Sequence, residues 1–138
     1  MNVIMVAVVW AGIIAQLLKI IVHMRQKAFS LSAVVTTGGM PSTHSALVVS
    51  LVSIIYLQEG FSTSFIISLV LALIVLRDSF GVRRTAGLEG VLLKKLLRTH
   101  HMKDIKEKTP FSLGHTPVEV FVGAGIGLIV SLLVYFLR

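Results

Sequence analysis

Cysteine is absent from this chain of 138 residues, and charged side chains are few. The absence of cysteine excludes disulfides, thiolate chemistry and cysteine-based zinc sites. Only 14% of the residues are charged, whereas 55% are hydrophobic, and the mean hydropathy is +0.92. A soluble domain of this size cannot bury so much apolar side chain, because too much of its surface faces water. The composition therefore predicts an integral membrane protein and excludes a disordered chain, a fibrous repeat and a soluble enzyme.

Acidic residues are also scarce, since 6 Asp and Glu stand against 13 Lys and Arg, a net charge of +7. In a membrane protein this excess indicates cytoplasmic loops and anionic lipid headgroups, and nucleic acid is not an expected partner. The few carboxylates do not cluster as Mg²⁺ ligands do, so neither a metal nor a cofactor is expected. We also expect no separate signal peptide, because the first apolar run is long and lacks a small-residue cleavage pattern.

Four apolar segments predict a single all-α, membrane-embedded domain over residues 1–138. The transmembrane helices are expected at about 3–24, 41–57, 61–82 and 117–137. The second helix is expected to begin at Pro41 and to end before a tight turn at Gln58-Glu59-Gly60. In the last helix, Gly123-Ala124-Gly125-Ile126-Gly127 includes a small-xxx-small pair suited to close helix packing.

The long segment 83–114 between the third and fourth spans is polar. Within it, residues 88–102 carry apolar side chains at helical spacing with basic side chains between them. This pattern predicts an amphipathic helix at the membrane interface, added to a bundle of about four transmembrane helices. A homodimer is compatible with the sequence, but nothing in it sets the oligomeric state.

The basic residues predict how the chain is oriented in a cell membrane. With four spans, the 25–40 and 83–114 segments share one side, and both termini share the other. Twelve basic residues lie on or near the first side and only Arg138 on the second. The twelve are Lys19, Arg25, Lys27, Arg77, Arg83, Arg84, Lys94, Lys95, Arg98, Lys103, Lys106 and Lys108. The positive-inside rule therefore places the long basic loop in the cytoplasm and both termini outside.

The polar residues of the spans gather at the same membrane face. Lys19 lies near the end of the first span, Pro41-Ser42-Thr43-His44 opens the second, and Arg77 and Asp78 close the third. His115 to Glu119 opens the fourth. Charge inside a bilayer is costly, so such residues usually pair or line a functional cavity. We therefore expect a pocket where four helix ends converge.

The residues of this expected pocket suit an anion. Lys19, Arg83 and Arg84 supply cationic donors. The Gly38-Gly39 turn runs into a helix start at Pro41-Ser42, where backbone N–H groups favour phosphate, although Ser42 and Thr43 are also good helix caps. Arg83 and Arg84 also fit a positive-inside anchor.

Two histidines, His44 and His115, open two different helices and are candidates for a nucleophile and a proton donor. Glu119 follows His115 by four residues, one helical turn, so its carboxylate is expected to reach the ring. His23, His100 and His101 are interpreted instead as polar residues of the membrane rim. Asp78 is interpreted as structural, paired with a nearby arginine.

Three motifs together resemble those of the divergent type 2 phosphatidic acid phosphatase family, a membrane branch related to lipid phosphate phosphatases and vanadium-dependent haloperoxidases. They are Gly38-Gly39-Met40-Pro41-Ser42-Thr43-His44-Ser45, Asp78-Ser79-Phe80-Gly81-Val82-Arg83-Arg84 and Gly114-His115-Thr116-Pro117-Val118-Glu119-Val120. The resemblance covers essentially the whole chain in order and spacing.

The resemblance implies a role for each matching residue. Lys19 resembles the first-motif lysine, a phosphate ligand, and His44 the second-motif histidine that protonates the leaving group. His115 resembles the third-motif histidine, the nucleophile, and Glu119 stands where an orienting aspartate is expected. Thr43 and Thr109 replace a glycine and an arginine of the wider superfamily pattern, and no Arg-Pro follows Lys19 at the expected distance. Arg83 or Arg84 is expected to fill the place of the missing arginine.

The sequence thus predicts a metal-independent phosphatase of a phosphorylated lipid that works through a phosphohistidine. A cytoplasmic site favours phosphatidylglycerophosphate or phosphatidic acid, with undecaprenyl diphosphate as the alternative substrate. A non-catalytic lipid- or anion-binding membrane protein is a second alternative. A transporter or channel component is disfavoured, because the polar groups cluster at one face and leave the opposite half of the bilayer apolar.

Overall fold

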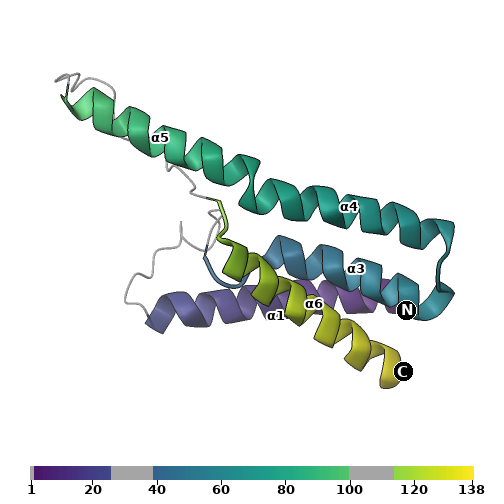
Figure 1. Ribbon diagram of the computed structural model, residues 1–138. Coiled ribbons are helices and arrows are strands. Elements are labelled where there is room, and N and C mark those ends of the chain that lie inside the picture. Colours follow the sequence, from purple (N-terminus) through teal and green to yellow (C-terminus); the bar gives the residue numbers. More distant parts are fainter. Residues whose placement is uncertain (1, 26–38, 100–113) are drawn as a thin grey trace.

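A computed structural model describes residues 2–25, 39–99 and 114–138 of the chain. Over these residues the protein is all-helical, with five helices and no strand. The helices are α1 (Val3–Arg25), α3 (Thr43–Glu59), α4 (Thr63–Phe80), α5 (Val82–Thr99) and α6 (Pro117–Phe136). Both termini lie at one end of the bundle, and successive helices α1, α3 and α4 run in alternating directions (Figure 1). The predicted all-α class is therefore confirmed.

The helix ends differ from the predicted boundaries by a few residues. Pro41 lies outside α3, whose N-cap is Ser42, so the prediction of a helix start at Pro41 is wrong by two residues. The side chain of Ser42 accepts a hydrogen bond from the backbone of Ser45, which is the interaction that makes serine a favoured cap. α3 also continues through the predicted turn to Glu59 and is closed by Gly60 at φ +65°.

α3 is the central helix of the bundle and packs against α1, α4 and α6. Small residues let its neighbours approach closely. On α1, Ala7, Ala11 and Ala15 are fully buried at intervals of four residues, which places them on one face. Near the terminal end of the bundle, Ala7 joins Ile54 and Ile55 in the core.

The interface between α3 and α6 is built on Gly123 and Gly127. A Cβ atom on Gly123 would collide with the carbonyl oxygen of Ser42, and one on Gly127 with that of Ala46. Gly125, on the other side of α6, has nothing within 4 Å of such an atom. The small-xxx-small prediction is therefore confirmed for the pair four residues apart.

Two of the described helices, α1 and α6, are long and apolar enough to cross a membrane. α3 has 17 residues and α4 has 18, and the latter ends in Arg77 and Asp78. The count of four transmembrane helices therefore stays a prediction.

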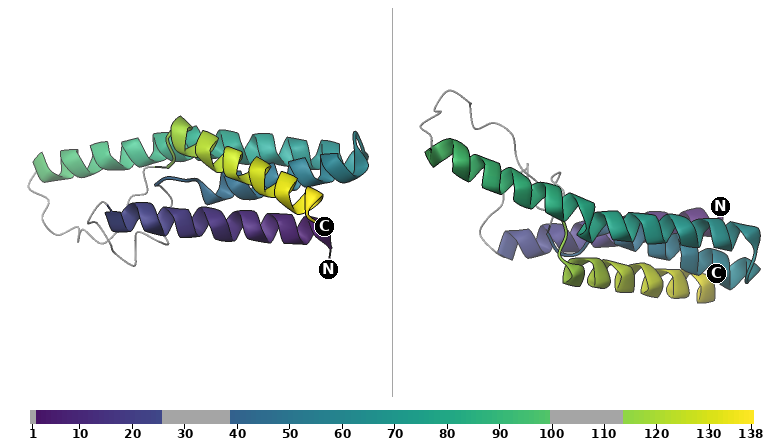
Figure 2. Two further views of the ribbon diagram at one scale, coloured as in Figure 1. Left: turned by 90° about the horizontal axis from the view of Figure 1, so that it is seen from below. Right: turned by 45° about the horizontal axis from the view of Figure 1, so that its top comes forward.

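α5 begins at Val82, six residues before the amphipathic helix predicted over 88–102, and its described part ends at Thr99. Gly81 separates it from α4, and Figures 1 and 2 show α5 leaving the bundle almost as an extension of α4. Its apolar side chains are exposed, with Leu88, Leu92, Leu93 and Leu96 between 50% and 61% accessible. The interfacial placement stays a prediction.

We expect α5 to bury its leucines in a membrane that contains anionic lipid, because basic amphipathic helices bind such surfaces. Residues 93 and 95 lie about 200° apart around a helix. In a Trp10→Phe background, Leu93→Trp should be quenched strongly by brominated phospholipid, whereas Lys95→Trp should be quenched much less. Equal quenching at the two positions would contradict an interfacial helix.

Candidate functional site

The predicted site residues come together at the end of the bundle opposite the two termini. The end of α1, the start of α3, the end of α4 and the start of α6 all lie there (Figures 1 and 2). Two backbone hydrogen bonds join three of these ends. Ser42 N donates to Glu119 O at 3.1 Å, and His115 N donates to Ser79 O at 3.1 Å. The 38–45 and 114–120 motifs are therefore held side by side, and the latter is anchored to α4.

His115 is buried, with 4% of its surface accessible, and its ring is bound to Glu119. The distance from His115 Nδ1 to Glu119 Oε2 is 3.0 Å. A carboxylate oxygen can only accept a hydrogen bond, so Nδ1 carries the proton and Nε2 of the neutral ring keeps its lone pair. This arrangement presents Nε2 as a nucleophile, oriented by a half-buried carboxylate.

The contact between His115 and Glu119 arises differently from the one predicted. His115 precedes α6, whose N-cap is Thr116, so the two residues do not share a helical turn. Glu119 instead folds back in a capping box, where its Oε2 also accepts from Thr116 N at 3.2 Å. Thr116 Oγ1 in turn accepts from Glu119 N at 3.4 Å. The cap that starts α6 therefore also fixes the orienting carboxylate.

The start of α3 is tied to α1 through Thr43. Its hydroxyl donates to Gln16 Oε1 at 3.0 Å, so this side chain is directed toward α1. Ser42 is fully buried, and its hydroxyl oxygen accepts from the hydroxyl of Ser45 at 2.9 Å. His44 differs from both, because its side chain is exposed.

A double-mutant cycle on Thr43 and Gln16 should detect this bond. Thr43→Val and Gln16→Leu should each lower the free energy of unfolding, with a coupling energy of about 1 kcal/mol between them. SDS titration of the purified protein, followed by circular dichroism, measures the four free energies. Additive effects within about 0.3 kcal/mol would show that the bond contributes nothing.

Lys19 and Gly39 meet on the side of the site formed by α1. Lys19 is only 6% accessible and lies close enough to Glu119 for their charges to interact. Gly39 has φ +89°, a conformation that favours glycine. A Cβ atom there would lie 3.5 Å from Lys19 Cε and 2.5 Å from His23 Cε1. Gly39, Lys19 and His23 therefore form one cluster.

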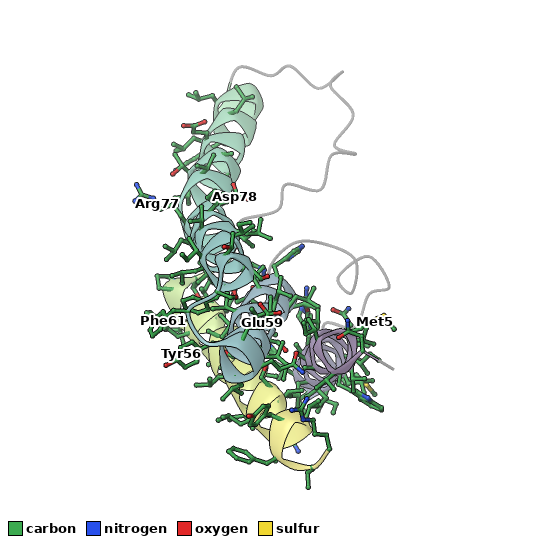
Figure 3. All side chains as sticks on the ribbon, turned by 90° about the vertical axis from the view of Figure 1, so that its right-hand side faces the viewer. Met5, Tyr56, Glu59, Phe61, Arg77 and Asp78 are labelled. Carbon is green, nitrogen blue, oxygen red and sulfur yellow. The ribbon has the colours of Figure 1, made fainter. Side chains whose placement is uncertain are left out.

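The two arginines of the 78–84 motif are placed only by their backbone. Arg83 and Arg84 lie in the first turn of α5, and their side chains lie outside the described residues. Arg77 is exposed and points away from the bundle in Figure 3, whereas Asp78 is half-buried. Residues 100–113, which include Thr109, His100 and His101, lie outside the described part of the chain. Within the described ranges, no group of three His, Asp or Glu side chains could hold a metal ion.

Three residues at this end of the bundle contact site residues although the sequence does not predict a role for them in the site. They are Gln16, His23 and Ser45. His23 was interpreted as a rim residue, yet its ring lies against Gly39. The sequence does contain a pattern that indicates which face of α1 is polar. Gln16, Lys19 and His23 are the polar residues of the first apolar run before its end at Met24, and their spacing of three and four places them on one helix face.

Comparison with known proteins agrees with the motifs. A family model described as "Divergent PAP2 family" matches residues 1–130. The chain is also 35% identical over 142 aligned positions to a Bacillus subtilis (strain 168) protein named "Uncharacterized membrane protein YuiD", covering 91% of this chain and 90% of that protein. No solved structure matches the chain. The resemblance predicted from the three motifs is confirmed.

Proposed function

Because the chain belongs to the divergent PAP2 family, we propose that it is a membrane lipid phosphatase that forms a phosphohistidine. The observation that carries the proposal is the buried His115 ring with Nδ1 bound to Glu119 at 3.0 Å. A ring held in this way keeps a lone pair on Nε2 and can share positive charge with the carboxylate once Nε2 is bonded. Lys19, whose charge interacts with that of Glu119, supplies a cation for phosphate.

The proposed reaction has two displacements at phosphorus. Nε2 of His115 attacks phosphorus, the P–O bond to the lipid breaks, and His44 gives a proton to the departing oxygen. His44 then takes a proton from water, whose oxygen attacks phosphorus and breaks the N–P bond. Phosphate leaves and the neutral His115 ring is restored. The exposed position of His44 suits a group that exchanges protons with substrate and water.

The remaining predicted residues are proposed to hold the phosphate oxygens. Lys19 does so from α1, and Arg83 or Arg84 from the start of α5. Gly39 allows the backbone to approach the phosphate closely, since it carries no side chain. Ser42 sets the position of the loop through its cap, and its hydroxyl would have to turn from Ser45 to contact phosphate. If Arg83→Ala and Arg84→Ala both retained wild-type turnover, neither arginine would have the proposed role in holding phosphate.

The substrate is proposed from the orientation that the basic residues predict. The site then faces the cytoplasm, with both termini outside, and phosphatidylglycerophosphate or phosphatidic acid is the preferred substrate. Undecaprenyl diphosphate is the alternative. A reporter fused to the C terminus that reads as cytoplasmic would overturn this orientation and the preference drawn from it.

The function is tested by phosphate release from the detergent-purified protein in EDTA. Phosphatidylglycerophosphate, phosphatidic acid and undecaprenyl diphosphate are offered separately, and ³²P-labelled phosphatidic acid is used to trap the intermediate. We expect release that resists EDTA and a protein-bound label that is labile to acid and stable to base, as a phosphoramidate is. A folded protein that binds these lipids without releasing phosphate would be an anion-binding relative and not a phosphatase.

A further inference from the structure

We propose that His23 binds the phosphate of the substrate through Nε2, as a positioning residue beside Lys19 and the Gly39 turn. The inference deepens the proposed function and rests on it for the identity of the anion. It assigns a third histidine to the site, one that the three family motifs do not include.

The position of His23 is fixed by contacts on two sides. Its Nδ1 lies 2.9 Å from the carbonyl oxygen of Lys19, one turn earlier on α1. Its other edge faces Gly39, because a Cβ on that glycine would lie 2.5 Å from His23 Cε1 and 3.1 Å from Nε2. The same Cβ would lie 3.5 Å from Lys19 Cε. The Nε2 edge of the ring and the end of the lysine side chain therefore flank the same glycine.

The partner of Nδ1 decides what Nε2 can do. A carbonyl oxygen can only accept, so Nδ1 is the donor and always carries a proton. Nε2 is then the ring nitrogen through which His23 could bind a ligand. When it is protonated it donates to a phosphate oxygen, and when it is neutral it accepts from a phosphate hydroxyl. Both states of Nε2 can therefore bind phosphate.

The surroundings connect this ring to the proposed nucleophile. Lys19 is buried beside it and interacts electrostatically with Glu119, which holds His115. An anion bound at Nε2 of His23 would therefore also lie near a second basic side chain of α1, that of Lys19. Gly39 permits this close approach of the His23 ring, because φ +89° favours glycine and a Cβ atom there would meet the ring.

Three substitutions of His23 distinguish the role of its Nδ1 from that of its Nε2. The amide of His23→Asn can still donate to the Lys19 carbonyl but has no group at the place of Nε2. The longer amide of His23→Gln reaches that place and keeps a donor there. We expect His23→Ala and His23→Asn to raise KM for phosphatidic acid about tenfold with kcat changed less than threefold, a typical loss for one charge-assisted hydrogen bond. His23→Gln should recover most of the affinity.

Binding is measured independently of turnover by NMR of the protein labelled with ¹⁵N-histidine, in EDTA. Inorganic phosphate and dioctanoyl phosphatidic acid are the two probes, and the spectrum of His23→Asn identifies the His23 signals. A shift of His23 Nε2 with either probe supports the proposal. A shift with the lipid alone assigns the site to a lipid headgroup, and a shift with both assigns it to phosphate in general.

The failure of this proposal is distinguishable from failure of the phosphatase. If no substrate is hydrolysed but the His23 Nε2 signal shifts with phosphate, the phosphatase proposal fails and the proposal that His23 binds phosphate is supported. If turnover is normal, His23→Asn keeps the wild-type KM and neither probe moves Nε2, the proposal is overturned. Gly39→Ala places a methyl group against the His23 ring. Like His23→Ala, it should weaken the binding of inorganic phosphate and of dioctanoyl phosphatidic acid.

Discussion

Replacing His115 by alanine is expected to abolish phosphate release, with a loss on the order of 10⁴-fold or more. The reason is that the His115 ring is buried and is oriented by the Glu119 carboxylate. The ring is bound to Glu119 through Nδ1, so Nε2 is the atom available to bond phosphorus. The assay is phosphate release from phosphatidic acid in EDTA, together with loss of the trapped ³²P label.

Glu119→Gln should have a smaller effect, on the order of 10²-fold or more. The amide can still complete the capping box with Thr116 but lacks the charge that stabilises a positive imidazole. His100→Ala is the matched control, because this histidine is interpreted as a rim residue and should retain wild-type turnover. If His115→Ala keeps more than about a tenth of the wild-type rate while folded, the ring is not the nucleophile.

Replacing Gly127 by alanine should destabilise the bundle strongly for so small a substitution. The added Cβ would collide with the carbonyl oxygen of Ala46 and lie 2.9 Å from Ser50 N, so backbone and not a flexible side chain must move. Overpacking of this kind typically costs about 1–3 kcal/mol. Separation of α3 from α6 would also stretch the two hydrogen bonds between Ser131 and Ser50. The Ser131 hydroxyl donates to Ser50 Oγ at 2.9 Å and to Ser50 O at 3.0 Å.

Gly125→Ala is the matched control in the same helix. Nothing lies within 4 Å of its Cβ, and alanine is favoured over glycine in a helix by about 1 kcal/mol. We therefore expect Gly125→Ala to be neutral or stabilising, whereas Gly127→Ala lowers the unfolding midpoint in SDS titration. Equal midpoints for the two variants would show that α3 and α6 are not packed through Gly127.

Gly123→Ala tests whether the same interface supports the site. Its Cβ would collide with the carbonyl oxygen of Ser42, whose N–H donates to Glu119 O. A displacement of Ser42 would move Glu119, which is bonded to it and which orients His115. Gly123→Ala should therefore reduce turnover as well as the free energy of unfolding.

The sequence alone determined the all-α class, the approximate ranges of the helices and the family. Long apolar runs form helices in a membrane because every backbone polar group must be bonded within the segment. Serine and threonine caps mark the starts of α3 and α6, and the motifs indicate the family that comparison confirmed. The reach of Glu119 to His115 also followed from spacing, although the capping box, and not a shared helical turn, is what produces it.

Only the tertiary structure decided which faces of these helices meet. Helices that are apolar all round carry little periodic signal, so their sequences do not specify which side packs. For this reason the directions of Thr43 toward Gln16 and of His23 toward Gly39 were not predictable. The burial of Lys19 beside Glu119 likewise depends on how α1 is rotated against α3 and α6, and this rotation is set by the fit of small residues across the interfaces.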